Sequence, residues 1–125
     1  MSVVYDAGVL IAAERNNRAV WVDHRVRLEL GLVPVTTAPV VAQVSRSSRQ
    51  ARLRHFLRGC DVVPFGAGDA HEVGTLLSAA RTADVVDGHV VLVAARAGLA
   101  VFTSDEGDLT RLAARISPKV RVRPL

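Results

Sequence analysis

Four aspartates stand at the boundaries of apolar segments. Carboxylates in such places can hold a metal ion. Asp6 follows the apolar run 2–5, and Asp87 lies near the start of a long apolar stretch. Asp105 and Asp108 follow a second apolar run. Neighbouring carboxylates repel one another unless protons or cations offset their charge. Hard oxygen ligands suit Mg²⁺ or Mn²⁺, so we expect such a metal at Asp6, Asp87 and Asp105, with Asp108 completing the site.

The chemistry that such a site suggests is hydrolysis of a phosphodiester bond. A divalent ion can hold a phosphoryl oxygen while negative charge develops on it, and it can ionise a bound water near neutral pH. Mg²⁺ keeps several waters and takes one or two carboxylates directly. Acids beyond the direct ligands are therefore expected to act through water.

Helix capping is the alternative explanation for most of these acids. Asp105 and Asp108 could stabilise a helix N-terminus beside Ser104, and Asp84 could do the same for the stretch that contains Asp87. Asp6 has no equally obvious capping role, because it follows a strand and enters a turn. Spacing alone leaves both explanations open.

The elements that would position these acids alternate along the chain. Apolar runs bounded by turn residues predict five strands. Between them, apolar residues that recur every three to four positions predict helices. The strands are expected at 2–5, 32–35, 61–65, 99–102 and 120–123. Helices are expected at 7–14, 19–30, 49–57 and 69–81, in the stretch that begins at Asp84 and stops at Gly98, and, as a short helix, after Thr37. This order predicts an α/β fold with a mostly parallel sheet of four or five strands and helices on both faces. Ligands of such sheets bind beyond the carboxyl ends of the strands, where the acids fall.

Composition fits one small domain spanning residues 1–125. Half of the 125 residues are hydrophobic but only 4% are aromatic, so Val, Leu and Ala must fill the core. No apolar run approaches the roughly 20 residues needed to cross a bilayer, and no signal peptide is evident. The single cysteine, Cys60, fits a reducing cytoplasm. We expect a cytoplasmic protein without a membrane partner.

The excess of basic over acidic residues indicates either a polyanionic binding partner or a surface of solvated arginines. The chain has 16 Lys and Arg against 12 Asp and Glu, and a formal charge of +4. Arg46, Arg49 and Arg52 recur every three residues, so a continuous helix would place them near one face that could hold phosphates. Since few aromatics are present to stack on bare bases, a structured RNA such as a tRNA is the more natural substrate.

Four motifs in register resemble those of PIN domains, and more narrowly of VapC-type ribonuclease toxins from VapBC toxin–antitoxin systems. They lie at 4–10, 37–44, 86–91 and 101–109 and span almost the whole chain. The resemblance implies a Rossmann-like α/β/α sandwich and RNA cleavage dependent on Mg²⁺ or Mn²⁺. It also implies a homodimer and inhibition by a cognate VapB-like antitoxin.

Residue by residue, the resemblance makes Asp6, Asp87, Asp105 and Asp108 the family's acids. Thr103 and Ser104 would contribute a hydroxyl near the metal water and the substrate. The departure is Gln43, which stands where the family has a Glu.

Gln43 can orient water through its amide oxygen, but it adds no negative charge and cannot act as a base. The chain is therefore either a metal-dependent endoribonuclease or a weak or inactive relative that still binds RNA or an antitoxin. Asp84, one helical turn from Asp87, could compensate for the lost charge, although capping explains it more simply. A phosphatase of the haloacid-dehalogenase type is a third reading, disfavoured because position 8 is Gly where that class has Asp.

Overall fold

The computed structural model describes residues 2–104 and 106–125. Strands and helices alternate along it. The strands are β1 (Val3–Tyr5), β2 (Val35–Thr37), β3 (Asp61–Val63), β4 (Ala100–Thr103) and β5 (Val122–Pro124). The helices are α1 (Ala7–Glu14), α2 (Arg18–Glu29), α3 (Ala38–Val44), α4 (Ala51–Leu57), α5 (Ala67–Ala80), α6 (Val85–Ala97) and α7 (Gly107–Arg115).

The strands form one sheet in the order β3-β2-β1-β4-β5, and every neighbouring pair is parallel. Tyr5 at the end of β1 lies beside Phe102 of β4, and Val101 lies beside Val122 of β5. The predicted parallel sheet is confirmed. Since β1 and β4 are central neighbours, the segments that follow them start from adjacent points on the carboxyl edge.

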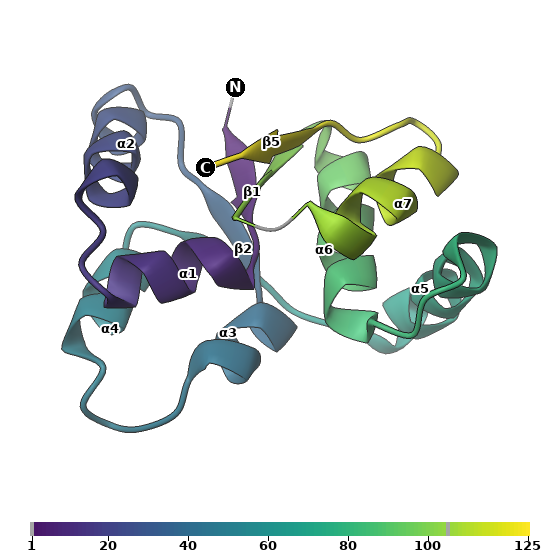
Figure 1. Cartoon of the computed structure of the whole chain (residues 1–125), viewed down its shortest axis with the longest axis horizontal. Coiled ribbons are helices and arrows are strands. Elements are labelled where there is room, and N and C mark those ends of the chain that lie inside the picture. Colours follow the sequence, from purple (N-terminus) through teal and green to yellow (C-terminus); the bar gives the residue numbers. More distant parts are fainter. Residues whose placement is uncertain (1, 105) are drawn as a thin grey trace.

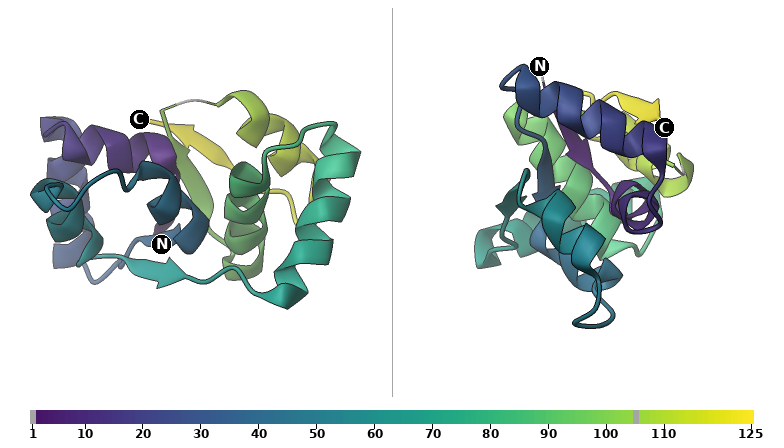
Figure 2. Two further views of the ribbon diagram at one scale, coloured as in Figure 1. Left: turned by 90° about the horizontal axis from the view of Figure 1, so that it is seen from below. Right: turned by 90° about the vertical axis from the view of Figure 1, so that its left-hand side faces the viewer.

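Helices cover both faces of this sheet, as the sequence predicts (Figure 1). Helices α1 to α4 gather on one side and α5 to α7 on the other, and two further views show the same division (Figure 2). The middle of α6 is wholly buried from Gly88 to Ala94. Its apolar residues explain why α6 lies directly against the sheet and carries its first turn to the carboxyl edge.

Strand β1 is anchored by an aromatic contact on the α2 and α4 side. The Tyr5 hydroxyl lies 3.0 Å from Nδ1 of the buried His24, and the His24 ring stacks on Phe56 at a centroid distance of 3.9 Å. Stacked rings and a satisfied hydroxyl hold a buried tyrosine in one position. The residue after Tyr5 is Asp6, so this contact also fixes where the first acid starts.

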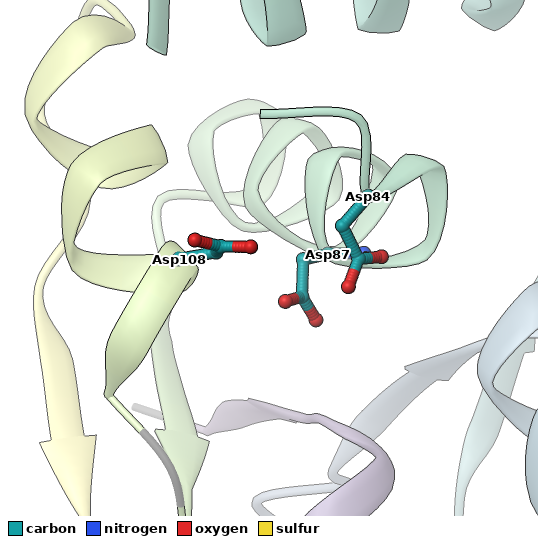
Figure 3. A group of neighbouring side chains, drawn as sticks. All are labelled: Asp84, Asp87 and Asp108. Atoms are coloured by element: carbon teal, nitrogen blue, oxygen red, sulfur yellow. The ribbon is translucent and has the colours of Figure 1, made fainter. Parts of the chain in front are cut away.

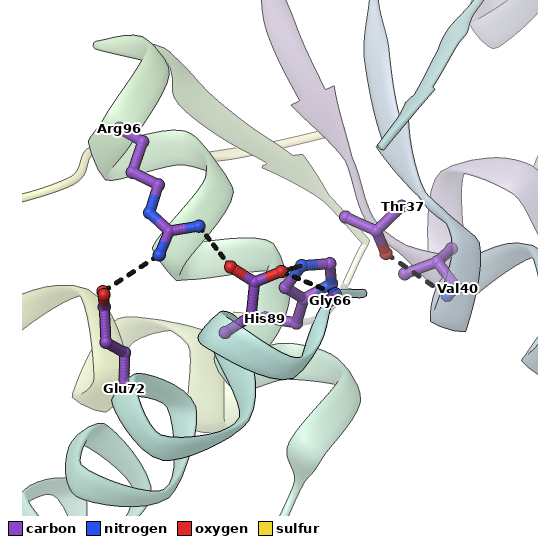
Figure 4. Close-up of polar contacts among 7 residues, drawn as sticks. Thr37, Val40, Gly66, Glu72, His89 and Arg96 are labelled. Carbon is purple, nitrogen blue, oxygen red and sulfur yellow. Dashed lines mark hydrogen bonds and ion pairs between the residues drawn. The ribbon is translucent and has the colours of Figure 1, made fainter. Parts of the chain in front are cut away.

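Helix α6 is tied to α5 by a polar network (Figure 4). The Arg96 guanidinium contacts Asp69 at 2.5 Å and Glu72 at 3.0 Å, while Asp69 also accepts from the Gly66 backbone N–H at 2.8 Å and thus caps α5. The ring of His89 is buried 3.7 Å from Asp69, away from the acids of the first turn of α6. These contacts fix the rotation of α6 about its axis.

Several predicted boundaries are displaced from those of the structure. The second strand was expected at 32–35 but lies at Val35–Thr37, because Thr36 is buried and its hydroxyl donates to the Tyr5 carbonyl oxygen at 3.0 Å. The helix expected at 49–57 begins at Ala51. Within the described residues, none of the helices combines the length and the apolar character needed to cross a membrane.

Candidate metal centre

Three carboxylates from two separate segments meet at the carboxyl edge of the sheet (Figure 3). Asp84 and Asp87 lie at the start of α6 and Asp108 in the first turn of α7, and one oxygen of each lies within 4.8 Å of the others. Opposite ligands of a Mg²⁺ ion lie about 4.2 Å apart, since each oxygen is about 2.1 Å from the metal. A small side-chain movement or a bridging water would therefore close the cluster around one hard divalent ion.

Asp84 is both a cap and a member of this cluster. Its Oδ1 accepts from the Asp87 backbone N–H at 3.0 Å, which makes it the N-cap of α6. The capping prediction is confirmed for Asp84. Since one of its carboxylate oxygens also lies within the cluster, capping does not exclude the compensating role that Gln43 suggests for it.

The pKa of Asp87 reflects its burial and the repulsion between the carboxylates. Its pKa is raised from the ordinary value of 3.8 to about 7, first because burial penalises its charged form and then because of the neighbouring Asp84, Asp6 and Asp108 carboxylates. Near neutral pH the Asp87 carboxyl is therefore partly protonated. A divalent ion would replace that proton, since ligating carboxylates must be ionised.

Two groups that the sequence does not single out, Thr82 and Arg111, contact the Asp108 carboxylate. The Thr82 hydroxyl donates to Asp108 Oδ2 at 3.0 Å, and the Arg111 guanidinium donates to Asp108 Oδ1. Arg111 and Thr82 together hold the pKa of the Asp108 carboxyl below its usual value. The spacing of Arg111 three residues after Asp108 is the one signal that could have revealed this contact.

Asp6 lies at the same edge but is engaged with the protein. It is 5% exposed, its Oδ1 accepts from the Val9 backbone N–H at 3.2 Å, and its Oδ2 accepts from the Thr103 hydroxyl. The structure gives Asp6 a capping role that is not obvious from its sequence context, because it is the N-cap of α1. It is outside the group of Asp84, Asp87 and Asp108, although its charge contributes to the raised pKa of Asp87.

The hydroxyl groups of Thr103, at the end of β4, and of Ser104, just after it, lie in different environments. Thr103 is buried and bonded to Asp6, whereas Ser104 is exposed. Ser104 lies against Gly8: a Cβ on Gly8 would come within 1.9 Å of the Ser104 hydroxyl oxygen. Gly8 therefore lets the turn after β4 approach the turn after β1. The predicted metal ligand Asp105 lies outside the described residues.

The remaining predicted site residues lie on α3, in the loop that follows it and on α4. Gln43 is exposed near the end of α3. The expected shared face of Arg46, Arg49 and Arg52 is wrong, because α3 ends at Val44 and α4 begins at Ala51. The Arg46 guanidinium instead donates to the carbonyl oxygens of Ser45 at 3.0 Å and of Ala42, on α3, at 3.4 Å. A role in RNA binding for these arginines remains a prediction.

Comparison by sequence gives no match, either to a family model or to a curated protein. Comparison of structures does give matches. The chain superimposes on VapBC2 from Rickettsia felis, solved bound to a DNA fragment from its promoter, with a TM-score of 0.76 and 15% identity over 100% of this chain and 99% of that one.

Two further structures are similar along nearly the full length. FitAcB from Neisseria gonorrhoeae has a TM-score of 0.66 and 19% identity, covering 97% of this chain and 96% of its own. PAE2754 from Pyrobaculum aerophilum has a TM-score of 0.64 and 16% identity, covering 98% and 84%. At these identities the likeness shows a shared fold, and the argument for function has to come from the site itself.

Proposed function

We propose, from the premise that the chain has the PIN-type fold, that it is a metal-dependent endoribonuclease and the toxin of a toxin–antitoxin pair. The observation that carries the proposal is the meeting of Asp84, Asp87 and Asp108, with one oxygen of each within 4.8 Å of the others. Carboxylates brought so close favour a bound cation. The hard oxygen donors suit Mg²⁺ or Mn²⁺.

The residues would divide the work by position. Asp87 and Asp108 would hold the ion from two different helices, with Asp84 beside them and Asp105 completing the set as the family motif implies. Thr82 keeps Asp108 oriented through its 3.0 Å hydrogen bond. When bound, the ion would supply the positive charge that stabilises a phosphodiester under attack by water.

Asp6 would support the site from its edge. Its two oxygens already accept from Val9 and Thr103, so its charge is fixed in place next to the cluster. In this role Asp6 adds attraction for a cation without moving, either directly or through a water. Gln43 would orient a water by hydrogen bonding.

The partners follow from the same premise. Two of the similar structures carry the names VapBC2 and FitAcB, and the first is a complex with promoter DNA. A VapB-like antitoxin is therefore the expected inhibitor, a homodimer the expected assembly, and RNA in the cytoplasm the expected substrate. Co-expression with the small protein encoded by the neighbouring reading frame tests the pairing, because a non-binding neighbour would remove this part of the proposal.

Cleavage of a structured RNA in Mg²⁺ or Mn²⁺ tests the catalytic part. Wild-type protein should cleave, while EDTA, Asp87→Asn and Asp108→Asn should each reduce the rate by at least about 100-fold, the upper end of the roughly 10–100-fold loss seen when only the residues that support metal ligands are changed. Asp61→Asn, an exposed acid on β3, is the matched control. Undiminished cleavage by both cluster variants would exclude this site as the catalytic centre.

The second candidate is a catalytically weak binding module, favoured by one observation. Gln43 stands exposed where the family motif has a carboxylate. If the missing charge limits activity, Gln43→Glu should convert a silent protein into an active nuclease. Robust cleavage by the wild type would eliminate this candidate.

A further inference from the structure

A groove of about 530 Å³ with a basic wall lies at the opposite edge of the sheet from the carboxylates. It is formed by the end of α6, the start of β4 and the segment that leads into β5. Ser2 and Ala100 line it, and they lie at the amino ends of β1 and β4. Its positive side chains come from Lys119, Arg121 and Arg123.

The charge of this groove is not neutralised by the described part of the protein. Lys119, Arg121 and Arg123 take part in none of the ion pairs found among residues 2–104 and 106–125, and the groove lining described there includes no acid. By contrast, Arg96 contacts two carboxylates and Arg111 contacts one. The groove therefore gathers three cations in one place without a counterion among the described residues, unlike Arg27, Arg96 and Arg111.

The negative end of the α6 dipole offsets only a small part of the positive charge of the groove. A helix C-terminus carries roughly half a negative charge, which is small against three cations. Its last carbonyls are also occupied, because Ala94 O accepts from the Leu99 N–H at 3.0 Å and Ala95 O from the Gly98 N–H at 3.3 Å. Most of the positive potential is left to face solvent or a ligand.

The spacing of the cations follows from the strand. Residues two apart on a β-strand point to the same side, roughly 6.6 Å from each other, and Arg121 and Arg123 both line the groove. Arg123 lies beside Phe102 of β4. The next residue of β4 is Thr103, whose hydroxyl donates to Asp6. The row of cations thus runs along the edge strand from the groove towards the carboxylate edge.

We propose that this groove binds the backbone of an RNA, with Lys119, Arg121 and Arg123 contacting successive phosphates. Guanidinium groups match phosphate oxygens in a two-pronged hydrogen-bond geometry. The apolar part of the wall, Ala94, Leu99 and Pro118, is suited to the faces of sugars or bases. The inference rests on the proposed function, because it assigns the surface that holds the substrate at a distance from the reacting bond.

The test is RNA binding in EDTA, measured by fluorescence anisotropy with a labelled RNA hairpin over a range of salt concentrations. The double variant Arg121→Ala/Arg123→Ala should bind at least about tenfold more weakly at low salt. The slope of log affinity against log salt should fall by about 1.5, since each lost phosphate contact contributes roughly 0.7–0.9. Arg121→Lys/Arg123→Lys should retain most of the slope, because it keeps the charge.

The matched control is Arg18→Ala/Arg25→Ala on α2, which removes the same net charge from two exposed positions. An equal loss in the control would overturn the proposal, since any two arginines would then serve. An unchanged salt slope for RNA binding by Arg121→Ala/Arg123→Ala would also overturn it. The proposal would likewise fail if this variant lost binding to duplex DNA but kept its binding to RNA. Circular dichroism verifies that each variant is folded.

Binding without metal separates this proposal from the nuclease proposal. Asp87→Asn protein should not cleave RNA, yet it should bind the hairpin with the wild-type salt slope. Normal binding with no cleavage by the wild type would remove the proposed catalysis and keep the groove. Cleavage with a salt slope that is unaffected by the groove variant would remove the groove and keep the catalysis.

Discussion

Replacing Asp87 by Asn should stabilise the metal-free protein while abolishing its stabilisation by metal. The pKa of Asp87 is raised from its ordinary value of 3.8 to about 7, chiefly by burial and by the carboxylate of Asp84. A group with a raised folded-state pKa adds stability at low pH and loses it as pH rises through that pKa. Asn has no proton to lose, and its amide can donate to Asp84 as the protonated acid does.

The size of the effect follows from linkage and from exposure. The full shift would correspond to about 4 kcal/mol at pH 8. Because Asp87 is only partly buried, solvent screening reduces this to about 1–2 kcal/mol. Losing a negative charge at the start of α6 opposes it by about 0.3–1 kcal/mol. The net gain should be about 1 kcal/mol, or roughly 4 °C in melting temperature for a chain of this size.

Thermal unfolding followed by circular dichroism measures this gain. In EDTA, the difference between Asp87→Asn and wild type should be near zero at pH 4, grow up to about pH 7 and stay constant above it. Excess Mn²⁺ should then stabilise the wild type by about 2.7 kcal/mol at a hundred times its dissociation constant, and leave the variant unchanged. Asp61→Asn, on β3, serves as the control. If Asp87→Asn is less stable than wild type in EDTA at pH 8, the claim that burial and neighbouring carboxylates make ionised Asp87 destabilising is refuted.

Three further perturbations test the surroundings of the cluster. Thr82→Val removes the donor to Asp108 and should weaken Mn²⁺ binding in calorimetry by about tenfold; an unchanged affinity would show that the bond does not orient Asp108. Arg111→Ala should instead strengthen Mn²⁺ binding roughly two- to fivefold, the range of one exposed ion pair, and a weakened affinity would mean that Arg111 positions Asp108 instead of competing for it. Gly8→Ala should destabilise the protein by about 1–3 kcal/mol in urea unfolding, because its methyl group meets the Ser104 hydroxyl; a neutral result would show that Ser104 simply rotates away.

The sequence predicts the layout of the fold because its signals are local. Glycine ends α6 at Gly98 with a positive φ, and the apolar spacing from Ala7 to Glu14 predicts α1 with the bounds that the structure has. Alternation of strands and helices then gives a parallel sheet with few alternatives. The misplaced second strand shows the limit, since Thr36 is polar in sequence but buried through a bond to β1.

The membership of the cluster is harder to predict, because it depends on contacts between distant segments. Asp87 and Asp108 were expected at the site and lie in it, whereas Asp84 was expected chiefly to cap. Thr82 acts on a residue 26 positions away. Asp6 shows the reverse: its place at the edge follows from topology, but its cap on α1 depends on a backbone turn that spacing does not reveal.

The arginines show why charge runs mislead when helix bounds are uncertain. Arg46 and Arg49 lie in the loop between α3 and α4, so their regular spacing has no helical face to mark. The cations that do line one groove include Arg123 on β5 and Arg121 just before it, where the period is two and the signal is only these two residues. A short edge strand at the chain's last residues gives too little pattern to be recognised as a basic surface.

The most direct test of the central claim is the position of Mn²⁺ in a crystal of the wild-type protein, located by its anomalous scattering. The ion should lie between the start of α6 and the first turn of α7, at about 2.1–2.5 Å from carboxylate oxygens of Asp87 and Asp108. A saturating Mn²⁺ soak that leaves those oxygens without a metal, or places the ion elsewhere on the chain, would contradict the account.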